Sequence, residues 1–204
     1  DVSGAGPAVL FVHGLPTSGR LFGPLAARLA VRHTCIVVDL PGLGRSPALA
    51  DGRLDPDAIV AALEAERAAR GIDAWAIVGH DAGSALAVHY AAAHPTRVTA
   101  LALLAPPLFP DLAPPPLMRL LRAPIFGPLV APAVAAVLRR ALPRLLRRPD
   151  EAGRAAAAAF GQPFRGLRAS QRLVRLARWG DPAVVLARTA ALLPALRVPT
   201  LVVH

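Results

Sequence analysis

One short motif carries the residue with the strongest case for chemistry. Asp81 stands at the centre of GHDAG (79–83), which follows the apolar run 74–78 and precedes a helix-like stretch. Small residues on both sides let such a turn hold its central residue in a strained conformation above the edge of a sheet. We therefore predict a nucleophilic carboxylate, kept ionised by the first amides of the following helix. The plainer alternative is that Asp81 only caps that helix. The supporting residues of the motif are Gly79, His80 and Gly83.

A second motif fits the first. HGLP (13–16) follows the apolar run 8–12. A glycine-bearing turn at the end of a strand can aim a backbone N–H at a developing oxyanion, together with the N–H of the residue after the nucleophile. These two donors are assigned to Leu15 and Ala82. The supporting residues of this turn are His13, Gly14 and Pro16.

No cofactor or metal is expected. The loop DLPGLGRS (39–46) has two glycines in a phosphate-loop spacing, but it lacks the third glycine and the lysine, so we interpret it as a structural turn. His13, His80 and His204 end apolar runs and could gather on a metal, although the two motifs already account for two of them. The other histidines are expected at helix ends or on the surface: His33, His89 and His94.

The apolar runs predict an α/β sheet. They lack polar alternation, as parallel strands covered on both faces do, and they alternate with helix-like stretches. Ser18 and Asp55 are expected to cap the first two helices, the second with Pro56 at its first position. The expected strands are 8–12, 35–40, 74–78, 98–104 and 200–203, and the expected helices are 18–30, 56–70, 83–94 and 182–196.

This alternation stops between residues 107 and 180. Proline clusters lead into helical patterns at 133–146 and 165–179, and no run of strand length follows before 200. We predict a core at 1–106, a helical cap insertion at 107–180, and a continued core at 181–204. The insertion is expected to cover the active site.

The charge of the chain is local. The 204 residues are 54% hydrophobic and 18% charged, with a net charge of +10. Residues 111–180 hold 13 arginines and 3 acids, so they account for all of it, and nucleic-acid binding is not implied. We expect these arginines to form a solvated outer face. The less favoured alternative is contact with an anionic membrane surface through Arg139, Arg140, Arg144, Arg147 and Arg148.

The remaining composition excludes two classes of protein. No apolar stretch is long enough to span a membrane without an interruption, and the apolar share excludes a disordered chain. A single cysteine, Cys35, permits no internal disulfide and is expected in the core. It fits a reducing compartment, so we expect a cytoplasmic protein.

The order HGLP, DLPGLGRS, GHDAG and a basic helical insertion resembles the α/β-hydrolase superfamily, over essentially the whole chain. An aspartate at 81 most resembles its epoxide hydrolase and haloalkane dehalogenase branch. The resemblance implies a mostly parallel sheet flanked by helices, with a helical cap. It also implies that Asp81 attacks an electrophilic carbon of a small apolar substrate to form an alkyl ester, which water hydrolyses through an oxyanion held by Leu15 and Ala82.

The sequence departs from both branches. Dehalogenases commonly place Trp after the nucleophile and often Asn in the HGxP turn, where this chain has Ala82 and Leu15. Epoxide hydrolases of this type use cap tyrosines to protonate the opening oxygen, whereas the only tyrosine here, Tyr90, follows the elbow. Trp179 could supply a donor, but a lone Trp is more often packing.

The resemblance further implies that the chain is incomplete at both ends. The family's base, a histidine oriented by an acid, is expected after His204, so this chain alone is expected to be inactive and poorly soluble. The favoured function is an epoxide hydrolase-like enzyme. The alternatives are a haloalkane dehalogenase, an esterase-like hydrolase, and a non-catalytic binding protein of the same fold.

Overall fold

A six-stranded sheet organises the computed structural model, with the strand order β1-β3-β2-β4-β5-β6. The strands are β1 (Val2–Ser3), β2 (Ala8–Val12), β3 (Thr34–Val38), β4 (Trp75–His80), β5 (Val98–Leu104) and β6 (Thr200–Val203). All neighbouring pairs are parallel except β1 with β3. The structure describes residues 1–47, 55–110, 116–145, 150–161, 164, 169–178 and 181–204.

The five predicted strands are confirmed, with ends shifted by no more than two residues. Strand β1 was missed because its two residues are too short to form an apolar run. Their pairing with Cys35 and Ile36 adds an antiparallel edge to the sheet.

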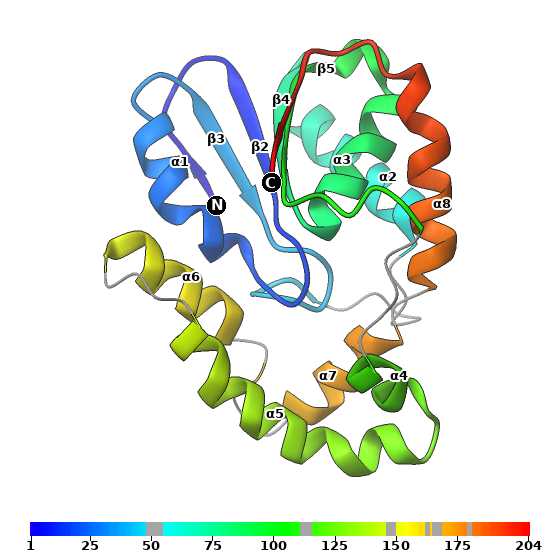
Figure 1. The fold of residues 1–204 in the computed structure, drawn as a ribbon. Helices are drawn as coiled ribbons and strands as arrows, with labels where there is room; N and C mark the ends of the chain where they lie inside the picture. Colours follow the sequence, from blue (N-terminus) through cyan, green and yellow to red (C-terminus); the bar gives the residue numbers. More distant parts are fainter. Residues whose placement is uncertain (48–54, 111–115, 146–149, 162–163, 165–168, 179–180) are drawn as a thin grey trace.

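Helices cover both faces of the sheet (Figure 1). The turn η1 (Gly19–Phe22) and helix α1 (Gly23–Leu29) lie on one face. Helices α2 (Pro56–Ala69), α3 (Ala82–Ala93) and α8 (Pro182–Leu192) lie on the other. Two short 3₁₀ turns, Pro95–Arg97 and Leu193–Ala195, lead into β5 and β6.

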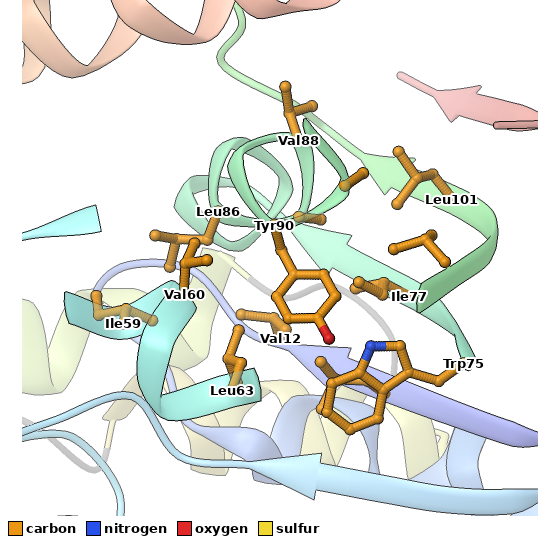
Figure 2. Packing of buried hydrophobic residues seen from close by; sticks show 14 of the residues in the cluster. Val12, Ile59, Val60, Leu63, Trp75, Ile77, Leu86, Val88, Tyr90 and Leu101 are labelled. Atoms are coloured by element: carbon orange, nitrogen blue, oxygen red, sulfur yellow. The ribbon is translucent and has the colours of Figure 1, made fainter. Parts of the chain in front are cut away.

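The alternation of side chains along β4 divides the core into two parts. Trp75 and Ile77 are buried in the larger apolar cluster with α2 and α3, where Tyr90 packs against Trp75 (Figure 2). Ala76 and Val78 face the opposite cluster, beside η1 and α1. Cys35 is buried in this second cluster, as predicted.

The predicted caps have opposite outcomes. Asp55 Oδ1 accepts the amide of Asp57 at 3.2 Å, so the cap of α2 is confirmed. The Ser18 prediction is wrong, since its buried hydroxyl has no hydrogen-bond partner and makes no cap contact. The expected helix 18–30 is instead η1 followed by α1, because Pro24 suits the first turn of a new helix.

The expectation that His89 is a surface or helix-end residue is also wrong. His89 is buried on α3, where its ring Nε2 lies 3.0 Å from the hydroxyl of Thr189 on α8. The Thr189 hydroxyl donates to Val185 O, so Nε2 is the donor to Thr189. This contact joins the two helices through a satisfied polar pair.

The segment between β5 and α8 is helical. It contains α4 (Pro116–Arg122), α5 (Phe126–Leu145), α6 (Glu151–Gly161) and α7 (Ala169–Ala177). Residues of α4, α5 and α7 form an apolar cluster of their own. Helix α6 contacts η1 and α1, which brings the segment to the carboxyl ends of β2 and β3 (Figure 1). Trp179, Arg147 and Arg148 lie outside the described residues, as does the side chain of Arg144.

A polar cluster ties α2 to α3 far from the elbow. Glu64 forms an ion pair with Arg67 at 2.7 Å and accepts the hydroxyl of Tyr90 at 2.6 Å. Hydrogen bonds from Arg67 and Tyr90 lower the pKa of Glu64 from 4.5 to about 2. The stability that the ionised carboxylate contributes is therefore complete above pH 4.5, and it is lost as the pH falls toward 2.

We expect Glu64→Gln to unfold at a lower urea concentration than the original protein at pH 7. The difference should shrink as the pH falls from 4.5 toward 2, because the original carboxyl group then becomes neutral as well. Glu66→Gln is the matched control, since Glu66 pairs with Arg70 on the exposed side of the same helix. A difference that is constant over this pH range would contradict the assignment.

Candidate active site

Asp81 lies in a sharp turn between the end of β4 and the start of α3. Its backbone angles, φ 50° and ψ −125°, lie outside the regions that L-residues favour. The amide of Asp81 donates to Leu104 O of β5 at 3.0 Å, and its carbonyl accepts the amide of Ser84 at 2.8 Å. The turn is therefore held on both sides, as an elbow that presents a nucleophile requires.

The two sequence motifs meet at the carboxyl edge of the sheet. Strands β2 and β4 are parallel neighbours with Val12 opposite Gly79, so both motifs leave the sheet at the same level. The amide of Leu15 donates to Oδ2 of Asp81 at 2.9 Å. Asp81 makes no side-chain cap contact with α3, so the carboxylate is held by the HGLP turn and not by the helix amides that we expected.

Close approach of backbones explains the glycines of both motifs. A Cβ at position 83 would lie 2.1 Å from Val12 O, and one at position 79 would lie 2.6 Å from Gly83 O. A Cβ at position 14 would lie 2.5 Å from Oδ2 of Asp81. The strained backbone conformation itself belongs to Asp81, and the glycines give it room.

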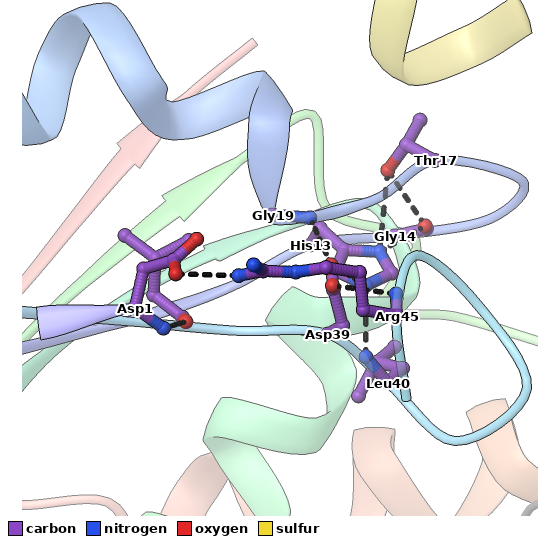
Figure 3. A network of polar contacts seen from close by, with 9 residues as sticks. Asp1, His13, Gly14, Thr17, Gly19, Asp39, Leu40 and Arg45 are labelled. Carbon is purple, nitrogen blue, oxygen red and sulfur yellow. Dashed lines mark hydrogen bonds and ion pairs between the residues drawn. The ribbon is translucent and has the colours of Figure 1, made fainter. Parts of the chain in front are cut away.

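His13 is a structural residue of the HGLP turn (Figure 3). Its ring is fully buried, and Nε2 accepts the amide of Leu40 at 2.9 Å. The other nitrogen, Nδ1, therefore carries the proton and donates to Gly14 O at 2.8 Å. Burial lowers the pKa of His13 below its usual value. With both nitrogens engaged, His13 is not a base that can accept a proton from water.

The loop 39–46 is built around a carboxylate of its own. Asp39 accepts the amide of Gly19 at 2.7 Å and the amide of Arg45 at 2.9 Å (Figure 3). Gly44 has φ 54°, and a Cβ there would lie 2.1 Å from the Asp39 carboxyl carbon. The geometry supports a structural turn, because Asp39 occupies the place where a phosphate loop would need space. We did not predict from the sequence that Asp39 holds the loop together, although an aspartate between a strand and a turn often hydrogen-bonds the backbone of that turn.

His80 is the other polar side chain beside Asp81. It is partly buried, and its Nδ1 has no hydrogen-bond partner. Its ring meets the edge of Phe160 from α6, with ring centroids 6.4 Å apart. Burial lowers the pKa of His80, and the charge of Asp81 opposes this shift only in part. We therefore expect a neutral imidazole at pH 7, placed between the elbow and the helical segment.

Tyr90 is not part of the site. Its side chain is fully buried at the far end of α3, and its hydroxyl is bound to Glu64. Across the described residues, no group of three or more His, Cys, Asp or Glu side chains is placed to hold a metal ion. In the same part of the chain, no helix has both the length and the hydropathy to span a bilayer.

Comparisons with known proteins show the family to which the chain is similar. Residues 7–204 match the alpha/beta hydrolase fold family model. A pimeloyl-[acyl-carrier protein] methyl ester esterase of Chromobacterium violaceum is 41% identical over 105 residues, which cover 52% of this chain and 39% of that enzyme. A haloalkane dehalogenase of Mesorhizobium japonicum is 37% identical over 108 residues, covering 51% and 33%.

Solved structures match over a longer range. The haloalkane dehalogenase DbeA from Bradyrhizobium elkani superposes with a TM-score of 0.75 at 28% identity, covering 98% of this chain and 74% of that protein. The matches to the two curated enzymes span less than half of each enzyme's length. Because the family model covers nearly the whole chain, the chain belongs to the α/β-hydrolase fold family.

Proposed function

We propose that this hydrolase opens a small apolar epoxide, with Asp81 as the nucleophile. The observation that carries the proposal is the contact between the strained Asp81 and the amide of Leu15. Attack through Oδ1 leaves Oδ2 as the carbonyl oxygen of the new ester. The Leu15 N–H, which binds Oδ2 in the resting carboxylate, is thus already in contact with the oxygen that becomes negative in the second step.

The proposed reaction has two steps. One Asp81 oxygen bonds to a ring carbon, the C–O bond of the epoxide breaks, and the opened oxygen takes up a proton from water. Water then adds to the ester carbonyl and gives its proton to the histidine base that the resemblance places after His204, and the resulting oxyanion is stabilised by the amides of Leu15 and Ala82. Its collapse releases a diol and restores the carboxylate. Ala82 fits this role because the first amides of a helix have no partner within it.

An apolar substrate agrees with the surroundings of the elbow. Leu15 from the HGLP turn is partly buried against the main core, and its amide contacts Asp81. Phe160 from α6 packs on His80 beside the nucleophile. We propose that residues 107–180 form a cap, so that the substrate is enclosed between apolar residues of the helical segment and of the sheet edge.

Ester hydrolysis is the second candidate, favoured by the 41% identity to the methyl ester esterase. Attack of a carboxylate on an ester produces an anhydride and an alcohol, and water hydrolyses the anhydride. Both reactions expel an alkoxide, but in an epoxide the relief of ring strain drives this step, whereas an ester has no such strain. Asp81 therefore suits the epoxide better.

Three substrates with the same apolar group distinguish these functions: a terminal epoxide, a methyl ester and a primary chloroalkane. The assay uses the complete protein, because hydrolysis of the ester needs the base that is expected after His204. We expect it to release the diol fastest from the epoxide. Faster release of methanol or of chloride would replace the epoxide assignment with esterase or dehalogenase activity. No turnover of any of the three, with tight binding of the apolar group, would favour the non-catalytic binding protein.

A further inference from the structure

The outer side of α5 is apolar without being buried. On its inner side, Ala131 and Ala135 belong to the cluster shared with α4 and α7. On its outer side, Phe126, Leu129 and Val137 are 59%, 73% and 62% exposed. At 100° per residue, these three positions fall on one side of the helix. A helix that is apolar on both sides is normally covered on both sides.

The exposed side of α5 formed by Phe126, Leu129 and Val137 extends further at both ends. Ile125, in the turn between α4 and α5, is 77% exposed, and Arg140 is exposed at the far end of the stripe. In Figure 1, α5 runs along the edge of the molecule away from the sheet. We call Ile125, Phe126, Leu129, Val137 and Arg140 the outer α5 face.

The polar groups of this region are all of one kind. Between residues 116 and 145 the only polar or charged side chains are five arginines, with no acid, amide or hydroxyl among them. Arg178, directly after α7, donates to Ala123 O at 3.0 Å and to Pro124 O at 3.2 Å, which fixes the α4–α5 turn and places another cation close to Ile125. The outer α5 face is thus an apolar stripe among positive charges.

We propose that the outer α5 face docks on an anionic lipid bilayer. The apolar side chains enter the boundary between headgroups and acyl chains, and the arginines contact lipid phosphates. Helix α5 would lie parallel to the surface, with the helical segment between the bilayer and the sheet. The proposal is independent of the chemistry at Asp81, although a membrane is where apolar substrates concentrate.

Charge and chemistry favour a bilayer over the other occupants of this face. A second copy of the chain would bring two regions together that each carry +10 over residues 111–180. A folded protein partner usually adds about one hydrogen bond per 100–200 Å² of interface. In the described part of this face, arginines are the only side chains that can form such bonds. Lipid phosphates in a fluid bilayer require only cations as partners.

The test is flotation of the purified protein with vesicles of phosphatidylcholine alone or of phosphatidylcholine mixed with phosphatidylglycerol. We expect binding to the anionic vesicles and weaker binding at high salt, because salt screens the arginine–phosphate attraction. Ile125→Ser combined with Leu129→Ser should weaken this binding by about tenfold or more, since two large aliphatic side chains no longer leave water. Arg140→Gln should weaken it on anionic vesicles in particular.

A matched double variant elsewhere on the surface shows whether the effect is specific to the outer α5 face. Val31→Ser combined with Val184→Ser removes two exposed valines from α1's end and from α8, and should leave binding unchanged. Circular dichroism and gel filtration check the fold and the oligomeric state of each variant. The proposal is wrong if neither vesicle type binds, or if the two serine pairs behave alike. It is also wrong if the protein forms a dimer in solution and, among the variants, only Ile125→Ser combined with Leu129→Ser dissociates it.

Discussion

Asp81→Asn should reduce turnover of the epoxide by about 10⁴-fold or more, since removal of a nucleophile leaves only binding and oxyanion stabilisation. Asparagine keeps an oxygen that can accept the Leu15 amide, and it tolerates a positive φ better than most residues. The turn should therefore persist, and the lost activity should reflect lost chemistry. Steady-state kinetics measures the turnover, and thermal unfolding measures whether the fold persists.

Asp57→Asn is the matched control for this change. Asp57 is an exposed carboxylate on α2 that pairs with Arg188 at 2.8 Å, and nothing places it near the elbow. The control should keep full turnover. Equal activity in the Asp81→Asn variant and the original protein would remove Asp81 from the mechanism.

Gly83→Ala should destabilise the protein by about 3 kcal/mol, the upper end of the usual cost of overpacking. The added Cβ would lie 2.1 Å from Val12 O, and both partners are backbone, so no flexible side chain can move away. Helix α3 would have to shift from β2, and the Leu15–Asp81 contact would lengthen with it. Urea unfolding and epoxide turnover should therefore both fall.

Gly23→Ala provides the comparison, because Gly23 also lies in the first turn of a helix and a Cβ there meets nothing within 4 Å. It should change stability by no more than about 0.5 kcal/mol, or raise it slightly. If Gly83→Ala were as stable and active as Gly23→Ala, then close packing of α3 on β2 would not be what requires a glycine.

Much of the site could be predicted from sequence because its signals are local. The glycines in GHDAG and HGLP are needed where the chain passes close to other atoms, so these motifs can be recognised from residue types. Two parallel strands then bring both motifs to the carboxyl edge of the sheet. The exact partner of Asp81 was not predictable in this way. The helix amides and the Leu15 amide both suit a carboxylate, and only the folded structure shows that Leu15 is the partner.

The errors concern contacts between distant elements. His89 is an unremarkable polar residue in the sequence of α3, and only the packing of α8 against it shows that it is buried and paired. Asp39 binds Gly19, twenty residues away, so its organising role needed the fold. The exposed apolar stripe of α5 was equally hidden, since an apolar helical pattern does not reveal which of its sides a neighbour covers.

Turnover of the epoxide in ¹⁸O-labelled water tests the role of Asp81 most directly. In the proposed mechanism, water attacks the carbonyl carbon of the ester, so the labelled oxygen enters the Asp81 carboxylate and the first diol carries an oxygen from the enzyme. We predict that the peptide containing Asp81 gains ¹⁸O after repeated turnover, and that the peptide containing Asp57 does not. Label that appears in the diol from the first turnover, with none in the Asp81 peptide, would contradict a covalent mechanism through Asp81.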